Sequence, residues 1–212
     1  MAEATKRPTG AELLARLADA ALHHTGEKWP EWHTVPLNQW LLIPLGQQTG
    51  DHCSFCDGFP LPGDQSPPTV EHWQPRNGPH GKPDKRFEWA NLFLCCTACQ
   101  KAKGPKWDPL LLKPDSEDYS FEKYFECEFT TGKIIPKSDA SDHDKERARK
   151  TIEIYGLDGR AGMRLQLAGD WPNLKSWVDI DMRSHRYWLL ALREADAQMV
   201  KVCTPAELLD AD

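Results

Sequence analysis

The spacing of apolar and polar residues predicts a helix near the N-terminus, followed by a segment without regular structure. Residues 10–23 repeat apolar positions three or four residues apart, as an amphipathic helix does. The predicted apolar face consists of Leu13, Leu14, Leu17, Ala18 and Ala21. Residues 29–46 combine tryptophans with prolines, and we expect this segment to wrap irregularly over a core, because proline breaks regular structure and tryptophan favours burial.

The middle of the chain alternates between turn-rich and apolar stretches. Residues 57–69 and 74–86 are rich in glycine and proline and are predicted to form loops. Between these loops, Thr69–Glu71 is predicted to be a strand. The apolar stretch Asn91–Cys95 is expected to open a helix that runs through Gln100, and a nearby proline limits its length.

The C-terminal half predicts a hairpin and further helices. Two short strands are expected, Glu126–Phe129 and Lys133–Ile135, joined by a turn at Thr131-Gly132. Apolar positions with helical spacing predict helices over residues 141–155 and 184–202. Thr204-Pro205 is a typical helix start and predicts a short last helical turn.

Two cysteine pairs with the spacing Cys-x-x-Cys bracket the central part of the chain. The first pair is Cys53 and Cys56, and the second is Cys96 and Cys99. Each pair offers two thiolates from a tight turn, and four thiolates complete a tetrahedral zinc site. The spacing therefore predicts a structural zinc ion, with four buried thiols as the alternative. The other three of the seven cysteines do not suit a disulfide framework, because their number is odd.

Charge is distributed unevenly along the chain. The net charge is −6, which argues against tight nucleic-acid binding by the surface as a whole. Residues 76–106, however, hold seven lysines and arginines against two acidic residues, a local charge of +5 that leaves −11 for the rest. This basic segment overlaps the cysteine-rich region, so we expect nucleic-acid contacts there. Basic side chains that only face solvent are the alternative.

The residues between the cysteine pairs complete a known pattern. Glu71-His72 follows the first pair, Asn91-Leu92 precedes the second, and Lys103-Gly104 closes the stretch. Residues 50–112 thereby resemble the HNH nucleases, whose ββα-metal core often has four zinc cysteines around it. The resemblance implies an α+β fold in which this core and its four-cysteine zinc site are flanked by mainly helical N- and C-terminal segments.

The resemblance also implies a division of the chain. Residues 47–112 would form the HNH nuclease core with its zinc knuckles. Residues 1–46 would form an N-terminal helical, tryptophan-rich segment. Residues 113–212 would add a hairpin and helices that dock onto a partner. A chain of 212 residues is long enough for one domain of moderate size or for a small core with such appended segments.

Hydrolysis of a phosphodiester needs a nucleophilic water, a base and a cation. His72 is the predicted base, because a neutral imidazole accepts a proton near pH 7. Glu71 offers a hard oxygen suited to Mg²⁺ or Mn²⁺. The resemblance implies that Asn91 orients the loop that carries His72. An ordinary surface pair on a zinc ribbon is the alternative for Glu71-His72.

One departure from the family pattern concerns the second ligand of the catalytic cation. HNH nucleases usually have Asn or His directly after the last cysteine, whereas this chain has Gln100, whose carbonyl could bind the cation directly or through water. Lys103 is placed to meet a phosphate, with a solvated lysine as the alternative. Arg76 and Lys101 are further predicted contacts to nucleic acid.

The C-terminal half extends the resemblance to one HNH subgroup. Trp107-Asp-Pro-Leu-Leu-Leu, the acidic stretch 115–128, Gly132–Pro136 and Ile154–Leu157 resemble the HNH component of Septu and related retron-associated anti-phage systems, as does Trp89 before the asparagine. In those systems the nuclease partners an ABC-type ATPase. The tail would therefore dock onto such a subunit.

Together these patterns predict a metal-dependent HNH endonuclease, the effector of an anti-phage complex, with structural Zn²⁺ and catalytic Mg²⁺ or Mn²⁺. DNA is the expected substrate and RNA is an alternative. A catalytically decayed, zinc-stabilised module that binds nucleic acid or protein is the competing interpretation, which Gln100 keeps open. No apolar run approaches the ~20 residues that cross a bilayer, so we expect a cytoplasmic protein without membrane association.

Overall fold

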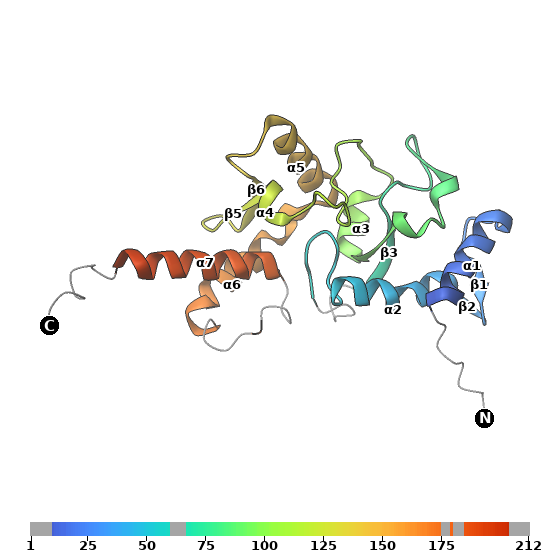
Figure 1. The fold of residues 1–212 in the computed structure, drawn as a ribbon, viewed down its shortest axis with the longest axis horizontal. Coiled ribbons are helices and arrows are strands. Elements are labelled where there is room, and N and C mark those ends of the chain that lie inside the picture. Colours follow the sequence, from blue (N-terminus) through green and yellow to red (C-terminus); the bar gives the residue numbers. More distant parts are fainter. Residues whose placement is uncertain (1–9, 60–66, 175–178, 180–184, 204–212) are drawn as a thin grey trace, which may run out of the picture.

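The computed structural model describes residues 10–59, 67–174, 179 and 185–203. Within these ranges the chain combines helices with three separate two-stranded antiparallel sheets, which confirms the α+β class. Helix α1 (Gly10–His23) lies at one end of the molecule beside strands β1 (Glu31–Trp32) and β2 (Val35–Pro36), and helix α7 (Arg186–Cys203) extends toward the opposite end (Figure 1). The prediction for Thr204-Pro205 lies outside the described residues.

The elements follow one another in a simple order along the chain (Figure 1). The helices are α1 (Gly10–His23), α2 (Leu37–Thr49), α3 (Thr97–Lys103), α4 (Phe121–Tyr124), α5 (Asp142–Tyr155), α6 (Ala161–Leu174) and α7 (Arg186–Cys203). The strands are β1 (Glu31–Trp32), β2 (Val35–Pro36), β3 (Pro68–His72), β4 (Leu92–Cys96), β5 (Phe125–Glu128) and β6 (Lys133–Pro136). Short 3₁₀ turns cover Pro83–Lys85, Trp89–Asn91 and Leu157–Arg160.

The first helix is confirmed, but its buried face differs from the predicted one. Helix α1 buries Leu13, Leu17 and Ala20. Leu14 belonged to the predicted face, yet 51% of it is exposed. The predicted set covered too wide an arc of the helix, whereas the buried residues lie at intervals of three and four along a single line.

The expectation of an irregular segment over residues 29–46 is wrong for its second half. Helix α2 runs through Pro44, which it contains in its interior. Leu37, Leu41 and Leu45 recur every fourth residue and are all buried against the core. Burial of this leucine stripe outweighs the missing backbone hydrogen bond of the proline.

Strands β3 and β4 pair with each other, and helix α3 follows β4 directly. The antiparallel register sets Glu71 opposite Phe93 and His72 opposite Leu92. The expected strand at Thr69–Glu71 is thus confirmed. The expected helix start over Asn91–Cys95 is wrong, because all five residues of β4 are buried in the pair with β3. The helix begins only at Thr97, and Cys96 caps its N-terminus by accepting a hydrogen bond from the amide of Cys99.

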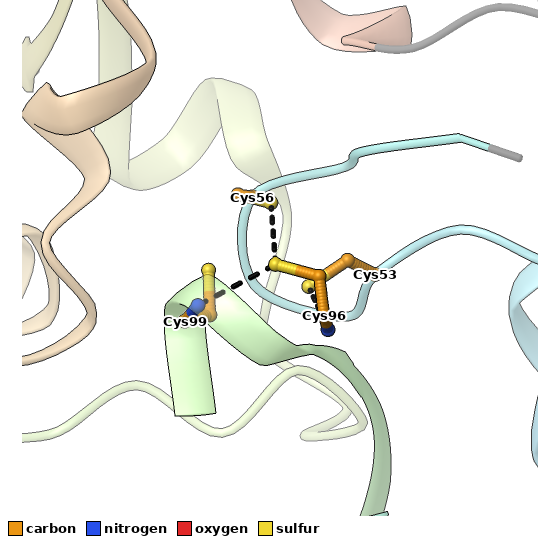
Figure 2. A group of neighbouring side chains, drawn as sticks. All are labelled: Cys53, Cys56, Cys96 and Cys99. Carbon is orange, nitrogen blue, oxygen red and sulfur yellow. Dashed lines mark hydrogen bonds between the residues drawn. The ribbon is translucent and has the colours of Figure 1, made fainter. Parts of the chain in front are cut away.

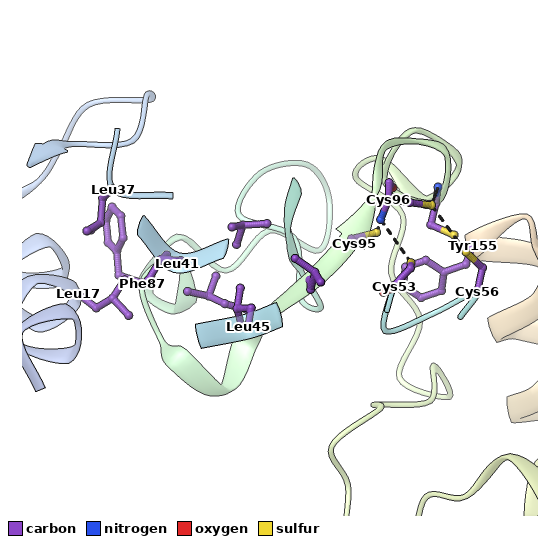
Figure 3. Close-up of a cluster of buried hydrophobic side chains, with 14 of the residues drawn as sticks. Leu17, Leu37, Leu41, Leu45, Cys53, Cys56, Phe87, Cys95, Cys96 and Tyr155 are labelled. Atoms are coloured by element: carbon purple, nitrogen blue, oxygen red, sulfur yellow. Dashed lines mark hydrogen bonds between the residues drawn. The ribbon is translucent and has the colours of Figure 1, made fainter. Parts of the chain in front are cut away.

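One hydrophobic cluster runs from α1 to the end of α5. It joins buried leucines of α1 and α2 to Val70, to Leu92, Leu94 and Cys95 of β4, to the four knuckle cysteines and to Tyr155 (Figure 3). Phe55 of the first knuckle stacks on Tyr155, with ring centroids 3.8 Å apart. Residues from all three predicted segments therefore contribute to this cluster, and the predicted division of the chain stays a prediction.

The C-terminal half forms around the hairpin of β5 and β6, which confirms the predicted hairpin. Gly132 in its turn has a φ of +72°, and a side chain there would collide with the carbonyl oxygen of Ala161. Only glycine fits both constraints, so the turn lets α6 start directly against the hairpin. Helices α5 and α7 confirm the two predicted helices within the described residues.

Helix α6 has no counterpart among the predicted elements. Its sequence contains Gly162, Gly169 and Pro172, which disfavour helices and hide the apolar pattern. Trp171 of α6 packs with Leu189 of α7, so contact between the two helices stabilises it. Within the described residues, none of the helices has the length and apolar character that crossing a membrane requires.

Candidate functional site

The four predicted cysteines converge on one point. Cys53 and Cys56 lie on the loop after α2, Cys96 ends β4, and Cys99 lies in α3 (Figure 2). Their four sulfur atoms all lie within 4.8 Å of one another and are buried. The Sγ atoms of Cys56 and Cys96 are 3.7 Å apart, close to the about 3.8 Å between two sulfurs of a tetrahedral zinc site with Zn–S bonds of about 2.3 Å. The cluster could therefore hold a zinc ion.

Backbone hydrogen bonds hold the sulfur atoms in this arrangement. The amide of Cys96 donates to Sγ of Cys53 over 3.3 Å, and the amide of Cys99 donates to Sγ of Cys96 over 3.4 Å. The amide of Ser54 donates to the carbonyl of Leu94, which ties the first knuckle to β4. Amide donors favour the thiolate form that zinc requires.

Arg160 adds a positive charge to the cluster. Its guanidinium Nη2 lies 3.2 Å from Sγ of Cys96. Four thiolates around one Zn²⁺ carry a net charge of about −2, so a guanidinium at this distance stabilises the charged centre. No sequence signal pointed to Arg160, because it lies in a separate 3₁₀ turn far along the chain.

Cys95 does not belong to the cluster although it neighbours Cys96. Consecutive residues of a strand point to opposite sides, and Sγ of Cys95 donates to the carbonyl of Cys96 instead. The side chain of Cys95 is fully buried in the hydrophobic core. Substitutions at these two adjacent cysteines can therefore separate the loss of a zinc ligand from the loss of a buried thiol.

We expect Cys96→Ala to lose zinc and to unfold, whereas Cys95→Ala keeps zinc and the fold. A structural zinc contributes about 10–16 kcal/mol of binding free energy, which is folding free energy when the site forms only on folding. Zinc content by elemental analysis and unfolding by circular dichroism measure both effects. A folded wild-type protein without zinc would contradict the assignment.

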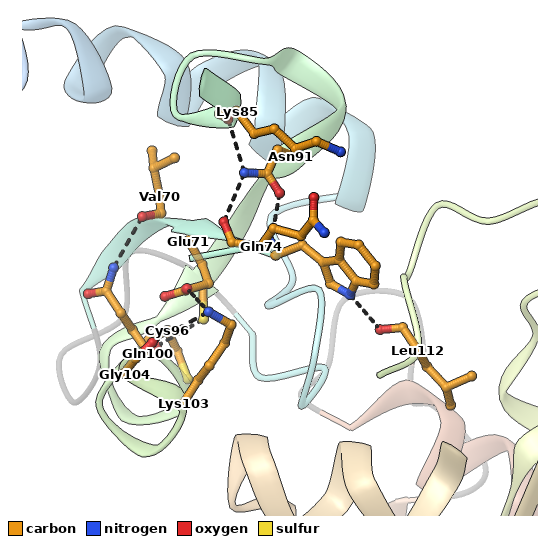
Figure 4. A network of polar contacts seen from close by, with 12 residues as sticks. Val70, Glu71, Gln74, Lys85, Asn91, Cys96, Gln100, Lys103, Gly104 and Leu112 are labelled. Carbon is orange, nitrogen blue, oxygen red and sulfur yellow. Dashed lines mark hydrogen bonds and ion pairs between the residues drawn. The ribbon is translucent and has the colours of Figure 1, made fainter. Parts of the chain in front are cut away.

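Glu71, Gln100 and Lys103 lie together between β3 and α3 (Figure 4). The ammonium of Lys103 donates to Oε1 of Glu71 over 2.8 Å, and both side chains are buried, Lys103 completely. Burial raises the pKa of Glu71, while the charge and hydrogen bond of Lys103 act in the opposite direction. Gln100 donates from Nε2 to the carbonyl of Val70 over 3.1 Å. A side-chain hydrogen bond from Gln100 also lowers the pKa of Glu71.

The predicted contact of Lys103 with phosphate stays a prediction, and so does the cation-binding role of Glu71 and Gln100. In the structure Lys103 contacts the carboxylate of Glu71 and the carbonyl of Gly104. Lys103 is not a solvated lysine, because it is completely buried. Glu71 and His72 are buried too, so they are not an ordinary surface pair. The sequence could not show that Lys103 would pair with Glu71, because the two residues meet only in the fold.

Removing Lys103 alone should destabilise the protein more than removing both partners. Lys103→Met leaves a buried carboxylate unpaired, which costs about 3–5 kcal/mol. The double variant Glu71→Met/Lys103→Met replaces both charges by apolar groups and should recover most of this loss. Urea unfolding of the three variants measures the coupling. A double variant as unstable as the sum of the single variants would show that the pair is not coupled.

His72 ends β3 and is held by the backbone of the following loop. Its Nε2 lies 2.9 Å from the carbonyl oxygen of Arg86. Because a carbonyl only accepts, Nε2 carries the hydrogen, and in the neutral ring Nδ1 carries the lone pair. The pKa of His72 is lowered to about 4, chiefly by burial. The hydrogen bond to the Arg86 carbonyl raises the pKa, whereas the positive charges of Arg76 and Lys103 lower it further. The imidazole is therefore neutral at pH 7.

Asn91 joins the two ends of the loop that follows His72. Its Oδ1 accepts from the amide of Gln74 over 2.8 Å, and its Nδ2 donates to the carbonyls of Gln74 and Lys85, each over 3.0 Å (Figure 4). The amide of Trp73 also donates to the carbonyl of Asn91. These bonds close the loop from both sides, while a catalytic role of Asn91 stays a prediction.

Asn91→Ala should destabilise the protein by about 1–3 kcal/mol, because it leaves partly buried backbone groups of Gln74 and Lys85 without partners. Asn77→Ala changes the same residue type at an exposed position of the same loop and should shift stability by less than about 0.5 kcal/mol. Urea unfolding of the zinc-loaded proteins distinguishes the two. Equal stabilities would mean that the Asn91 bonds do not hold the loop.

The N-terminal segment covers this loop through arginine contacts. Arg86 donates to the carbonyls of Gly26, Glu27 and Lys28. Trp29 then stacks on His72, with ring centroids 5.6 Å apart at 22°. Neither Arg86 nor Trp29 was among the predicted site residues, although the basic loop and the expectation that tryptophans cover the core pointed to this region.

The remaining predicted nucleic-acid contacts differ in their surroundings. Arg76 is partly buried and donates from Nη1 to the carbonyl of Glu27 over 2.7 Å. Lys101 is exposed on α3. Contact of either residue with nucleic acid stays a prediction.

The geometry defines a protein with a buried four-cysteine cluster that could bind zinc. Comparison with protein-family models and with curated protein sequences finds no match for this chain.

Proposed function

We propose that the protein is a metal-dependent endonuclease of the HNH type. The observation that carries this proposal is the arrangement of His72: it ends the first strand of a strand–strand–helix unit, and the Arg86 carbonyl orients its ring. A neutral imidazole with its lone pair on Nδ1 can accept a proton from water. Structural burial alone does not require a histidine at this position.

The surroundings of His72 support the same interpretation. Helix α3 brings Gln100 next to Glu71, so a carboxylate and an amide, both sources of hard oxygen ligands, lie together at the residue that precedes the proposed base in β3. These two residues would hold a Mg²⁺ or Mn²⁺ ion, which would stabilise negative charge on the phosphate. With zinc bound, the four-cysteine cluster at the start of α3 would fix the helix that carries Gln100 and Lys103.

The residues of the chain would divide the chemical work as follows. His72 accepts the proton of the attacking water at Nδ1. Asn91 positions His72 by closing its loop. Lys103 leaves the Glu71 carboxylate and moves toward the phosphate, which compensates the charge that the substrate brings. The basic side chains of residues 76–106 would contact the backbone of DNA or RNA.

A second candidate function is a zinc-stabilised binding module whose active site has decayed. It is favoured by one observation: Lys103 already neutralises the carboxylate of Glu71, the position where a cation is expected. Under this interpretation Glu71–Lys103 is a structural ion pair, and the protein binds nucleic acid or protein without cutting it. Nucleic-acid binding without cleavage under all metal conditions would favour this alternative.

We expect His72→Ala to reduce cleavage by about 10²–10⁴-fold, because a general base contributes this much to the rate. His80→Ala removes an exposed histidine from the neighbouring loop and should leave cleavage unchanged. Plasmid DNA and RNA are incubated with zinc-loaded protein and added Mg²⁺ or Mn²⁺. Because the resemblance also suggests an ABC-type ATPase as partner, each assay is run with and without that subunit. Cleavage by His72→Ala at the wild-type rate would refute the role of His72.

A further inference from the structure

Helix α1 carries a second apolar stripe beside the one that it buries in the core. This second stripe is exposed and consists of Leu14, Ala18 and Ala21. Residues at these intervals lie on one face of a helix. Leu14 is the largest of the three, and 51% of it is exposed. The apolar pattern of α1 is therefore wider than the core requires.

The exposed stripe lines a groove with a volume of about 320 Å³. The segment of residues 84–89 supplies the rest of the lining, with Phe87 and Trp89 as apolar residues and Asp84 and Glu88 as charged ones. Phe87 is buried and Trp89 is partly buried, whereas both acidic residues are exposed. An exposed apolar surface with polar residues around it is typical of a protein interaction site.

Aromatic contacts hold the segment of residues 84–89 in place. The ring of Phe87 lies edge-on to the rings of Trp29 and His24, with centroids 5.5 and 5.9 Å apart. The guanidinium of Arg86 lies 4.8 Å from the centre of the Phe87 ring and is itself bound to carbonyls of the N-terminal segment. The groove is thus formed before a partner arrives, which keeps the ordering cost of binding small.

The charge of the groove differs from that of its surroundings. Residues 76–106 contain seven basic residues and only two acidic ones, Asp84 and Glu88. Both acidic residues line the groove, and none of the seven basic residues is among the described residues that line it. Within the described part of the chain, no salt bridge joins either carboxylate to a basic side chain. An apolar groove with free carboxylates repels a phosphate backbone and favours a cationic partner.

We propose that this groove binds an amphipathic helix of a partner protein, with an aliphatic face against Leu14 and lysine or arginine residues next to Asp84 and Glu88. Helices commonly bind through such grooves by an apolar face with anchors three or four residues apart. The small side chains of Ala18 and Ala21 allow the two helices to approach closely. No residue that lines the groove is assigned to cleavage, so this interaction goes beyond the proposed nuclease function and does not depend on it.

A synthetic helical peptide of about five turns tests the proposal. The peptide has leucines along one face and lysines on both flanks, and its binding to the zinc-loaded full chain is followed by fluorescence anisotropy. We expect saturable binding. A second peptide with glutamates in place of the lysines should bind at least about tenfold more weakly, because its charges face the carboxylates of the groove.

Two leucine variants test the apolar part of the groove. Leu14→Glu places a charge in the exposed stripe and should weaken binding of the lysine peptide by about tenfold or more. Leu22→Glu makes the same change on the same helix, at a leucine that is 79% exposed and does not line the groove. It should bind like the wild type. Circular dichroism checks that both variants are folded.

Two double variants test the charged part. Asp84→Asn/Glu88→Gln removes both carboxylates and should weaken binding of the lysine peptide about fivefold, because each exposed ion pair contributes little. Glu117→Gln/Glu122→Gln changes the net charge equally at exposed positions outside the groove. Its binding should change by less than about twofold.

Three results would overturn the proposal. The first is a lysine peptide that does not bind saturably at millimolar concentration. The second is equal weakening by Leu14→Glu and Leu22→Glu, or equal weakening by the two double variants, which would show general charge attraction. The third is a dimer of the peptide-free protein that Leu14→Glu dissociates in sedimentation, which would mean that a second copy of the chain fills the groove. His72→Ala should bind the peptide like the wild type, which separates this result from the fate of the nuclease proposal.

Discussion

The four-cysteine cluster is the constraint on which the rest of the structure depends. It connects the loop after α2, the end of β4 and the start of α3, and its sulfur atoms lie inside the main hydrophobic cluster (Figures 2 and 3). A structural zinc contributes about 10–16 kcal/mol, as much as the entire net stability of a typical domain, about 5–15 kcal/mol. The strands β3 and β4 form only one two-stranded sheet, which is marginally stable by itself. Zinc binding would therefore determine whether this part of the chain is folded.

A second constraint acts on the loop after β3, and it determines the geometry of His72. Asn91 closes this loop from within, while Arg86 connects it to the N-terminal segment. Both residues bond to backbone carbonyls, so they fix the position of the main chain regardless of the neighbouring side chains. The same contacts bring Trp29 onto the imidazole of His72. The N-terminal segment is thus part of the environment of the proposed base, although it lies far from His72 in the sequence.

Features with an unambiguous local spacing could be predicted from the sequence, whereas features with conflicting local signals or without any local signal could not. The cysteine cluster, α1, α5 and the β5–β6 hairpin follow from short-range patterns and were found where expected. Helix α2 was missed because a stripe of leucines outweighs Pro44, and β4 because a short buried apolar run fits a helix or a strand equally well. Arg160 could not be predicted, because only the fold brings it to Cys96.

The Glu71–Lys103 pair explains why one structure is compatible with both a nuclease and a decayed module. A carboxylate buried this deeply stays ionised only beside a cation, and either the ammonium of Lys103 or a divalent ion can fill that role. In a nuclease the two cations would compete, so release of Lys103 would accompany metal binding, and the freed ammonium would need a new anion. A substrate phosphate provides that anion. Metal and nucleic acid would then bind cooperatively, whereas in a structural ion pair Lys103 stays on Glu71 in all conditions.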